Sequence, residues 1–446
     1  MIGIKIFKAY HSKLLDAFWR SVLACLVFYG FMSIFLVNTP IKGPSIQIHL
    51  DNDGRLAREK GAIMDFLIPT ALYNRIESLK KFLKEKVRPE LATWYQNQEI
   101  PAQFFREMGA GNWYGIELKK GRLVKGSALK EALMAEELAK VSPGVAVAVL
   151  AQIDLGLMGV LLFGSDKLKK RYGDSAVRGE TLMSLGNTER QAGSDVAGIQ
   201  MRARKVGGGW LLNGTKAYVT NGLISDLAVI TAISAPQASR NNRMSMYLVD
   251  LHTQGVQRTK LNKRVWIPSD LTRLQFSDVF VPDDHLLGNQ GQGLQQVLTI
   301  FTYSRVPIAA LTLGTALGAF ELALEHAKKR KIFGQTITNF QAKAFECADF
   351  YAKIESARLM LWKACWKMDQ NENFRQESSM AKYLAVEITR GVTAWAADIF
   401  GAASVIQEHP IHKFPMDAWA SALGEGTQDV QKLIIFRELM KKFRDD

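Results

Sequence analysis

The chain of 446 residues is longer than one hydrophobic core usually serves, so two or three domains are expected. Hydrophobic residues at 48% and charged residues at 22% are the proportions of an ordinary globular protein and exclude a disordered one. The three cysteines have no paired spacing, which argues against a disulfide framework or zinc ribbon and suits a reducing, cytoplasmic compartment.

The formal net charge of +14 invites a nucleic-acid or anionic-membrane interpretation. The basic residues are scattered, however, and alternate with acidic ones along helical stretches such as ESLKKFLKEKVRPE. A solvated surface, or attraction to a polyanionic small molecule, accounts better for this pattern. No nucleic-acid partner is expected.

The N-terminal segment has two competing interpretations. Residues 21–37 are nearly all apolar and follow four basic residues, as in a membrane signal anchor. Alternatively, residues 1–63 are an appendage or upstream sequence, because the codons for residues 60–63 can form a ribosome-binding sequence just before Met64. We favour the second interpretation, with the fold beginning at Met64.

Residues 64–181 have the hydrophobic period of helices, as in IESLKKFLKEKV and ALKEALMAEELAKV. An apolar run at 144–163 contains Gln152 and Asp154, which favours a buried helix over a membrane span. This part of the chain is predicted to be a helical N-terminal domain.

Residues 182–292 contain short β-branched and aromatic runs, such as WLLNGTKAYVTNG, DLAVITAIS and MSMYLVDL, which predict an antiparallel β domain. The glycines at 207–209 and the pair Asn213-Gly214 are interpreted as turns. Long helical patterns return over 293–446. The predicted order is therefore helical, β, helical.

Common catalytic motifs do not explain this chain. The seven histidines form no HExxH motif, and His409 and His412 are separated by Pro410, which favours a loop over metal ligands. No GxSxG elbow and no GxGxxG after a strand occur, so a serine hydrolase and a nicotinamide-binding Rossmann domain are not indicated.

Several spaced segments together carry a family resemblance. They are NTERQAGSDV (187–196), LNGTKAYVTNG (212–222), LQFSDVFVPDDHLLGNQGQG (274–293), RKIFGQTITNFQ (330–341), AADIFGAAS (396–404) and GEGTQDVQ (424–431). In this order they resemble the signatures of the acyl-CoA dehydrogenase family, over about Met64 to the C-terminus.

The resemblance implies an α+β fold with a helical N-terminal domain, a middle antiparallel β domain and a C-terminal four-helix bundle. It implies FAD between the last two domains, in a homotetramer or homodimer. The implied reaction is α,β-dehydrogenation of an acyl-CoA or acyl-carrier-protein thioester, with an electron-transfer flavoprotein as partner.

The resemblance also assigns residues to the expected sites. FAD is expected to contact Thr188, Ser194, Tyr218, Thr220, Gly401 and Thr427, and, from a neighbouring subunit, Arg330, Phe333 and Gln341. The expected substrate contacts are Ser194, Arg305, Gly424 and Gly426.

Glu425 is the candidate catalytic base. Locally, a carboxylate between two glycines, followed by Thr427 as a cap, also fits the start of a helix. A thioester α-proton needs a base beside it, however, and burial would raise the proton affinity of Glu425. The other base position of the family, immediately before Arg305, holds Ser304, which leaves Glu425 as the only carboxylate in such a position.

The departures from the family pattern bear on the substrate. Gly424 replaces the usual aromatic residue before the glutamate, which leaves room for a branched, substituted or carrier-linked acyl group and fits a biosynthetic enzyme. Rival interpretations are an oxygen-using oxidase or a flavin monooxygenase of the same fold. A catalytically quiet flavoprotein that binds DNA, or a membrane through residues 21–37, is the rival from another class.

Overall fold

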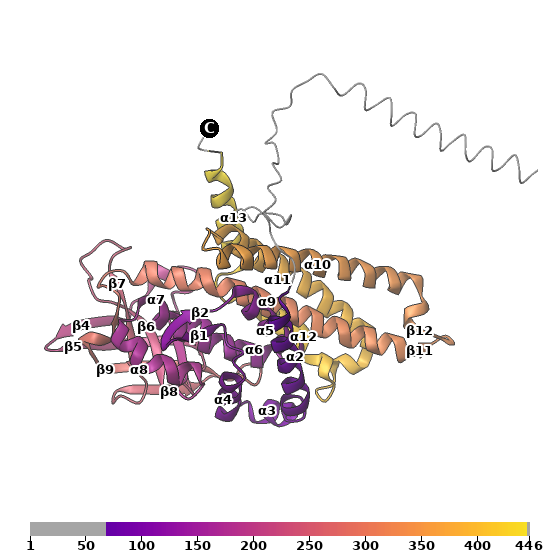
Figure 1. Cartoon of the computed structure of the whole chain (residues 1–446), viewed down its shortest axis with the longest axis horizontal. Coiled ribbons are helices and arrows are strands. Elements are labelled where there is room, and N and C mark those ends of the chain that lie inside the picture. The colour runs from indigo at the N-terminus through magenta and orange to yellow at the C-terminus, as the bar shows by residue number, and fades with distance from the viewer. Residues whose placement is uncertain (1–67, 444–446) are drawn as a thin grey trace, which may run out of the picture. The chain divides into compact units, whose positions relative to one another are not determined.

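The computed structural model describes residues 68–443, and Figure 1 shows their course. The apolar segment at 21–37 and the expected start at Met64 lie outside the described residues. Along the rest of the chain, helices come first, a sheet follows and long helices return, which confirms the predicted fold class. The limits 181/182 and 292/293 remain our proposed division into domains.

The first part of the chain is mainly helical. Three of its helices begin at serines, Ser127, Ser142 and Ser165, whose hydroxyls accept a hydrogen bond from a backbone N–H of the first turn. The helices are α2 (Thr70–Phe82), α3 (Leu91–Asn97), α4 (Ala102–Ala110), α5 (Ala128–Val141), α6 (Pro143–Leu150), α7 (Met158–Phe163) and α8 (Asp166–Val177), with a π-helical stretch η2 (Ala151–Leu157) between α6 and α7.

A short hairpin within this helical part was not predicted. Strand β1 (Ile116–Lys119) pairs antiparallel with β2 (Arg122–Lys125) across Lys120 and Gly121. Both turn residues have positive φ, 51° and 71°, as a type I′ turn requires. The hairpin was missed because its strands have only four residues each and a lysine stands where glycine or asparagine usually marks this turn.

Two helical stretches of the described residues, Pro143–Phe163 and Gly293–Lys329, are long and apolar enough to cross a membrane, but most of each is buried inside the protein. In the first, the buried Gln152 donates to the carbonyl of Thr181 at 3.0 Å and accepts from the N–H of Met183. These contacts tie the helix to the following sheet, so both stretches serve as core helices.

The middle part is an eight-stranded sheet in the order β10-β7-β6-β4-β5-β9-β8, with β3 beside β6. Most neighbours are antiparallel, whereas β3 and β4 pair with β6 in parallel. The strands are β3 (Met183–Gly186), β4 (Arg202–Val206), β5 (Gly209–Thr220), β6 (Leu227–Ile233), β7 (Met244–Asp250), β8 (Val256–Lys260), β9 (Leu271–Pro282) and β10 (Leu286–Leu287).

The predicted turn at Asn213-Gly214 is wrong, because both residues lie inside β5. The register with β9 shifts between Leu212 and Gly214, and Gly214 has φ +142°. The Asn213 amide donates to the Asp278 carboxylate at 2.8 Å across the strands. The glycine therefore serves a β-bulge, which local sequence does not distinguish from a turn.

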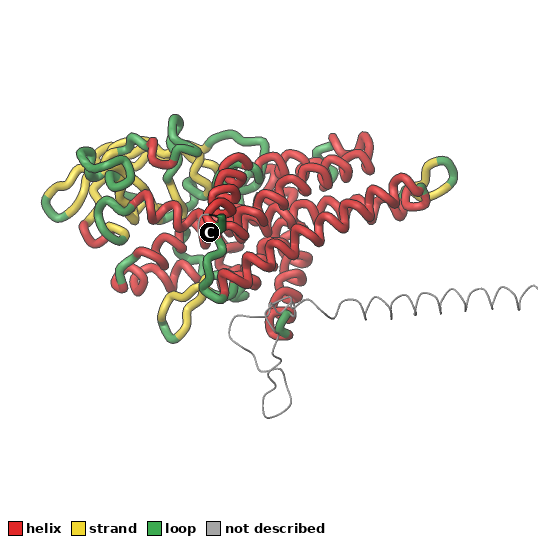
Figure 2. Tube along the Cα trace, turned by 90° about the horizontal axis from the view of Figure 1, so that it is seen from above, coloured by secondary structure: helices red, strands yellow, loops and turns green. Residues whose placement is uncertain are grey.

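The last part is a helical bundle built around α9. Figures 1 and 2 both show the β11–β12 hairpin at the opposite end of the long helices from the sheet. The elements are α9 (Gly293–Lys329), β11 (Lys331–Ile332), β12 (Gln335–Thr336), α10 (Gln341–Asp369), α11 (Arg375–Phe400), α12 (Lys413–Ala420) and α13 (Gln428–Lys441). Helix α9 alone is about 55 Å long at 1.5 Å per residue.

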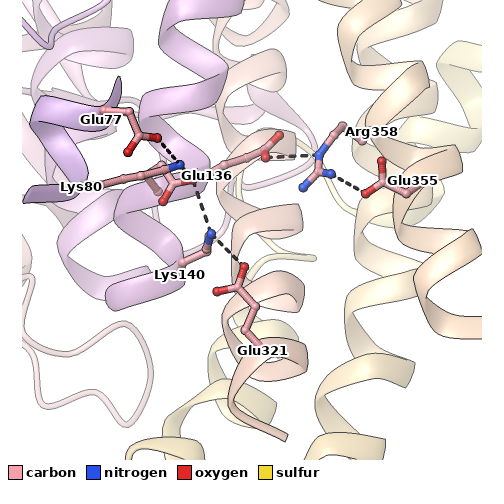
Figure 3. A network of polar contacts seen from close by, with 8 residues as sticks. Glu77, Lys80, Glu136, Lys140, Glu321, Glu355 and Arg358 are labelled. Carbon is pink, nitrogen blue, oxygen red and sulfur yellow. Dashed lines mark hydrogen bonds and ion pairs between the residues drawn. The ribbon is translucent and has the colours of Figure 1, made fainter. Parts of the chain in front are cut away.

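Ion pairs join α5 to this bundle (Figure 3). Lys140 of α5 lies 2.8 Å from Glu321 of α9, and Glu136 of α5 lies 3.5 Å from Arg358 of α10. Burial raises the pKa of Glu136 to about 7, although the Arg358 charge acts in the opposite direction. The first helices and the bundle are therefore bound by charge as well as by apolar packing.

Candidate active site

The turn Gly424–Glu425–Gly426 lies between α12 and α13 and has an unusual backbone conformation. Glu425 has φ +50° and Gly426 has φ +97°, both in the left-handed region. For a residue with a side chain this conformation costs on the order of 1 kcal/mol or more and persists only where the surroundings impose it. The structure therefore holds Glu425 in place at some expense of stability.

Two fully buried side chains impose that conformation. Lys382 of α11 donates from Nζ to the carbonyl oxygens of Gly424 and Gly426, the latter at 2.5 Å. Gln431 of α13 donates from Nε2 to the carbonyls of Glu425 and Gly426, at 3.1 and 2.9 Å. All three carbonyls of the turn are thus held from two helices.

The surroundings of Glu425 shift the pKa of its carboxyl group. Burial raises the pKa of Glu425, while the nearby cations Lys382 and Arg305 lower it in part. Arg305 lies in α9 and is itself 4% exposed, so burial lowers its pKa to about 10. A base whose pKa is moved toward neutrality is better matched to proton transfer at physiological pH.

The surroundings of Glu425 leave space and free polar groups. A Cβ added at Gly424 would meet no atom within 4 Å, so this position is open. The Nε of Arg305 has no hydrogen-bond partner among the described residues. Thr427 occupies the N-cap position of α13, but its side chain makes no capping hydrogen bond, so the expected cap is not formed. Its hydroxyl is available to a ligand.

Asp154 of η2 and Glu131 of α5 form a buried pair of carboxyl groups near this turn. Each is 1% exposed, and none of their four oxygens has a hydrogen-bond donor among the described residues. Burial, and then the adjacent Glu131, raise the pKa of Asp154 well above its usual range, and Glu425 adds to the effect. The protonated Asp154 carboxyl can donate a hydrogen bond to Glu131.

Three of the expected flavin contacts lie together on the sheet side. The N–H of Ala217 donates to the carbonyl of Thr188 at 2.8 Å, which brings the Thr188 segment beside Tyr218 and Thr220 of β5. Tyr218 has φ +58° and is 58% exposed. An exposed ring near two partly exposed hydroxyls fits a planar heteroaromatic ring with hydrogen-bond acceptors, as FAD carries.

A buried ion pair fixes this surface. Lys216 of β5, which is 0% exposed, lies 2.8 Å from Glu189. Burial lowers the pKa of Lys216 to about 8. The Lys216 charge lowers the pKa of Glu189 despite burial, and hydrogen bonds from the backbone N–H groups of Gln200 and Met201 add to that effect. The exposed Ser194 lies between Glu189 and Gln200, within the segment that these bonds close.

The remaining expected flavin contacts lie elsewhere in the subunit. Phe333, in the β11–β12 hairpin, is 95% exposed, and Arg330 and Gln341 flank that hairpin. Gly401 follows Phe400, whose ring lies 4.3 Å from that of His326 near the same end of α9. Arg305 and Arg330 are separated along α9 by about 37 Å. The structure therefore does not bring these four residues to the Glu425 turn of the same subunit.

Sequence reasoning missed the side chains that support these surfaces. Lys382 lies in α11 at the helical spacing of the buried Ser378, Ala385 and Thr389. A lysine on the apolar face of a helical pattern is the signal that could have revealed it, because such a charge needs specific partners. Gln431 gives the same signal more weakly, since a buried amide also needs partners.

Three family models match the chain in order. Residues 75–180 match the N-terminal domain of acyl-CoA dehydrogenase, residues 184–279 the middle domain and residues 291–440 the C-terminal domain. The chain is 32% identical over 367 residues to the probable acyl-CoA dehydrogenase YngJ of Bacillus subtilis (strain 168), covering 82% of this chain and 97% of that protein.

Two further relatives are informative. CarC of Acetobacterium woodii, a caffeyl-CoA reductase-Etf complex subunit, is 30% identical over 371 residues, covering 82% of this chain and 98% of CarC. The structure of PigA in complex with FAD has a TM-score of 0.79 and 28% sequence identity, covering 84% of this chain and 99% of PigA. The chain belongs to the acyl-CoA dehydrogenase family and is an FAD-dependent oxidoreductase, as the sequence predicts.

Proposed function

We propose that the protein catalyses the FAD-dependent α,β-dehydrogenation of an acyl-CoA thioester, with Glu425 as the base. The observation that carries the proposal is the Glu425 turn, because a strained backbone conformation, held by two buried side chains, presents a carboxylate of raised pKa. Raised proton affinity and backbone strain at one residue are typical of functional sites.

The residues divide the reaction among them. In the overall reaction the α-proton goes to the Glu425 carboxylate, a double bond forms between the α and β carbons, and bound FAD supplies the acceptor for the β-hydrogen with its electron pair. Arg305 provides a nearby positive charge in a buried setting, where charges act more strongly than in water. The turn's carbonyls are all bonded within the protein, so they do not compete for the substrate.

The open position at Gly424 supports a branched or substituted acyl group, carried by CoA or by an acyl-carrier protein. We further propose that an electron-transfer flavoprotein accepts the electrons, in a cytoplasmic enzyme. The similarity to a subunit of an Etf complex supports this partner.

We also propose that the enzyme works as a homotetramer or homodimer. The exposed group formed by Arg330, Phe333, Gln341 and Gly401 lies far along α9 from Arg305 and the Glu425 turn. A second copy is the simplest way to place that group beside the cofactor of the first.

The test is anaerobic titration of the full-length, FAD-loaded protein with a panel of acyl-CoA and acyl-carrier thioesters. One class should bleach the visible flavin band, and Glu425→Gln should retain FAD and slow bleaching by roughly 10²–10⁴-fold. Asp429→Asn, at a carboxylate that is 93% exposed four residues away, should react like the wild type.

Two outcomes would point elsewhere. Bound flavin that no thioester reduces would favour the oxygen-using or non-catalytic interpretations. Reduction that survives Glu425→Gln would keep the dehydrogenase assignment but reject Glu425 as the base.

A further inference from the structure

Lys382 is a buried cation that the proposed reaction does not itself require. Its side chain is 0% exposed and lies on the apolar face of α11, where a charged group is costly to desolvate. Burial lowers its pKa to about 8, although the Glu425 charge acts in the opposite direction. Both of its observed hydrogen bonds go to the turn that carries Glu425.

These two bonds flank the candidate base on either side. Lys382 holds the carbonyls of Gly424 and Gly426, and Gln431 holds the carbonyl of Glu425 from the opposite helix. Bonds from a charged donor are about twice as strong as neutral ones. With both neighbours fixed, Glu425 keeps its left-handed φ of +50°, and the direction of its Cα–Cβ bond is set by the backbone.

Lys382 also belongs to the small set of charges that surround Glu425. From α11 the facing group is Lys382, from α9 it is Arg305, and from η2 it is Asp154. Arg375, at the start of α11, acts on Arg305. Of the two cations that lower the pKa of Glu425, Lys382 has the larger effect.

We propose that Lys382 is a positioning residue for the reaction: it fixes the backbone of the Glu425 turn, and its charge sets the pH range in which Glu425 accepts a proton. The inference depends on Glu425 being the base, as proposed above. Lys382 thus has two roles. Its hydrogen bonds hold the turn, a role that it shares with Gln431, and its charge acts on Glu425, which the neutral Gln431 cannot do.

The expected effects follow from these two roles. Without the Lys382 charge, the burial effect on Glu425 is less opposed, so the pKa of Glu425 rises further. The carboxylate is then deprotonated only at higher pH, and the acidic limb of the rate profile moves to higher pH. Loss of the hydrogen bonds lets the turn relax, and a misplaced base slows the chemical step by about 10- to 100-fold with little change in KM.

The experiment measures anaerobic flavin reduction by stopped flow from pH 5 to pH 7.5, where a wild-type Lys382 with a pKa of about 8 is still mostly protonated. It uses the full-length holoenzyme and whichever acyl-CoA of the panel bleaches the flavin in the titration described above. Lys382→Met should be slow and have its acidic limb displaced upward. Lys382→Gln can still donate one hydrogen bond, so it should have the same displacement with a smaller loss of rate. Gln431→Leu should be slow but keep the wild-type pH profile, because the Lys382 charge remains.

A second readout needs no turnover. An infrared pH titration follows the carboxyl C=O band of Glu425, assigned by its absence in Glu425→Gln, and the band should persist to higher pH in both Lys382 variants. FAD content and melting temperature establish whether each variant is folded. If Lys382→Met does not fold, the test of the proposal rests on Lys382→Gln.

The proposal is overturned if a folded Lys382 variant keeps both the wild-type rate and the wild-type pH dependence. It is also overturned if Gln431→Leu displaces the profile as much as the Lys382 variants do. Failure of Glu425 as the base is recognised separately, from flavin reduction that persists in Glu425→Gln.

Discussion

At the scale of single residues, Asp154, buried beside Glu131, contributes to how stability depends on pH. Both groups are 1% exposed, and the pKa of Asp154 is well above its usual range because of burial and the adjacent Glu131. The folded protein therefore keeps a proton that the unfolded chain releases as pH rises above about 4. Stability is lost as pH rises toward the folded pKa of Asp154.

Asp154→Asn removes the titrating carboxyl and, with it, the loss of stability at rising pH, while keeping the shape of the side chain. The variant should melt at a higher temperature than the wild type at pH 8, and the difference should shrink as pH falls toward 5. Asp349→Asn, at an exposed position of α10, is the control and should show no such trend. A difference that is the same at every pH would show that Asp154 is ionised in the folded protein.

The catalytic candidate could be found from the sequence because its signal is local. A carboxylate between two glycines before a helix is visible in a few residues. The family resemblance then favoured a catalytic base over an ordinary helix start. Lys382, 43 positions earlier in the chain, could not be assigned to it. Only the packing of α11 against α13 brings that ammonium group to the turn.

At the scale of elements, the Lys216–Glu189 ion pair joins the Thr188 segment to β5. Lys216→Met should lower the free energy of unfolding by about 3–5 kcal/mol, because a buried carboxylate then loses its cation. The double variant Lys216→Met/Glu189→Gln should recover much of that loss. Denaturant unfolding followed by flavin and tryptophan fluorescence gives these values.

The control for this prediction is Lys205→Met on the neighbouring strand β4. Lys205 pairs with Asp283, but both side chains are 52% exposed, so the change should cost at most about 1 kcal/mol. If Lys216→Met were equally mild, the buried pair would not hold the flavin-side surface together.

Element types were predictable where the hydrophobic period is long, as over α5, α9 and α11. The β1–β2 hairpin was missed because four-residue strands carry too little pattern. The bulge at Gly214 was taken for a turn because glycine serves both, and only pairing with β9 distinguishes them.

At the scale of the whole molecule, we propose that each active site combines the Glu425 turn of one subunit with the Arg330 and Phe333 group of another. Two variants that are each inactive should therefore complement one another. Glu425→Gln lacks the base, and a chain with Arg330→Ala and Phe333→Ala lacks the exposed group on and beside the β11–β12 hairpin. Co-expressed with different tags and purified as hybrid pairs, they should recover about half of wild-type activity, because one of the two sites in each hybrid pair combines intact parts from both copies.

Each variant expressed alone is the baseline for this comparison and should be nearly inactive. Hybrids no more active than the two parents would show that each subunit builds its site alone. Arg330, about 37 Å along α9 from Arg305, would then not contact the flavin of a second subunit.

The sequence by itself determined the order of helical and β parts, the family, the cofactor and the candidate base, because these depend on hydrophobic period and on short motifs. Tertiary structure alone decided which buried side chains hold the Glu425 turn, that Asp154 faces Glu131, and that the expected flavin contacts fall into groups at opposite ends of α9. The physical reason is that a buried charge or amide needs partners that are distant in sequence, and only packing brings them within reach.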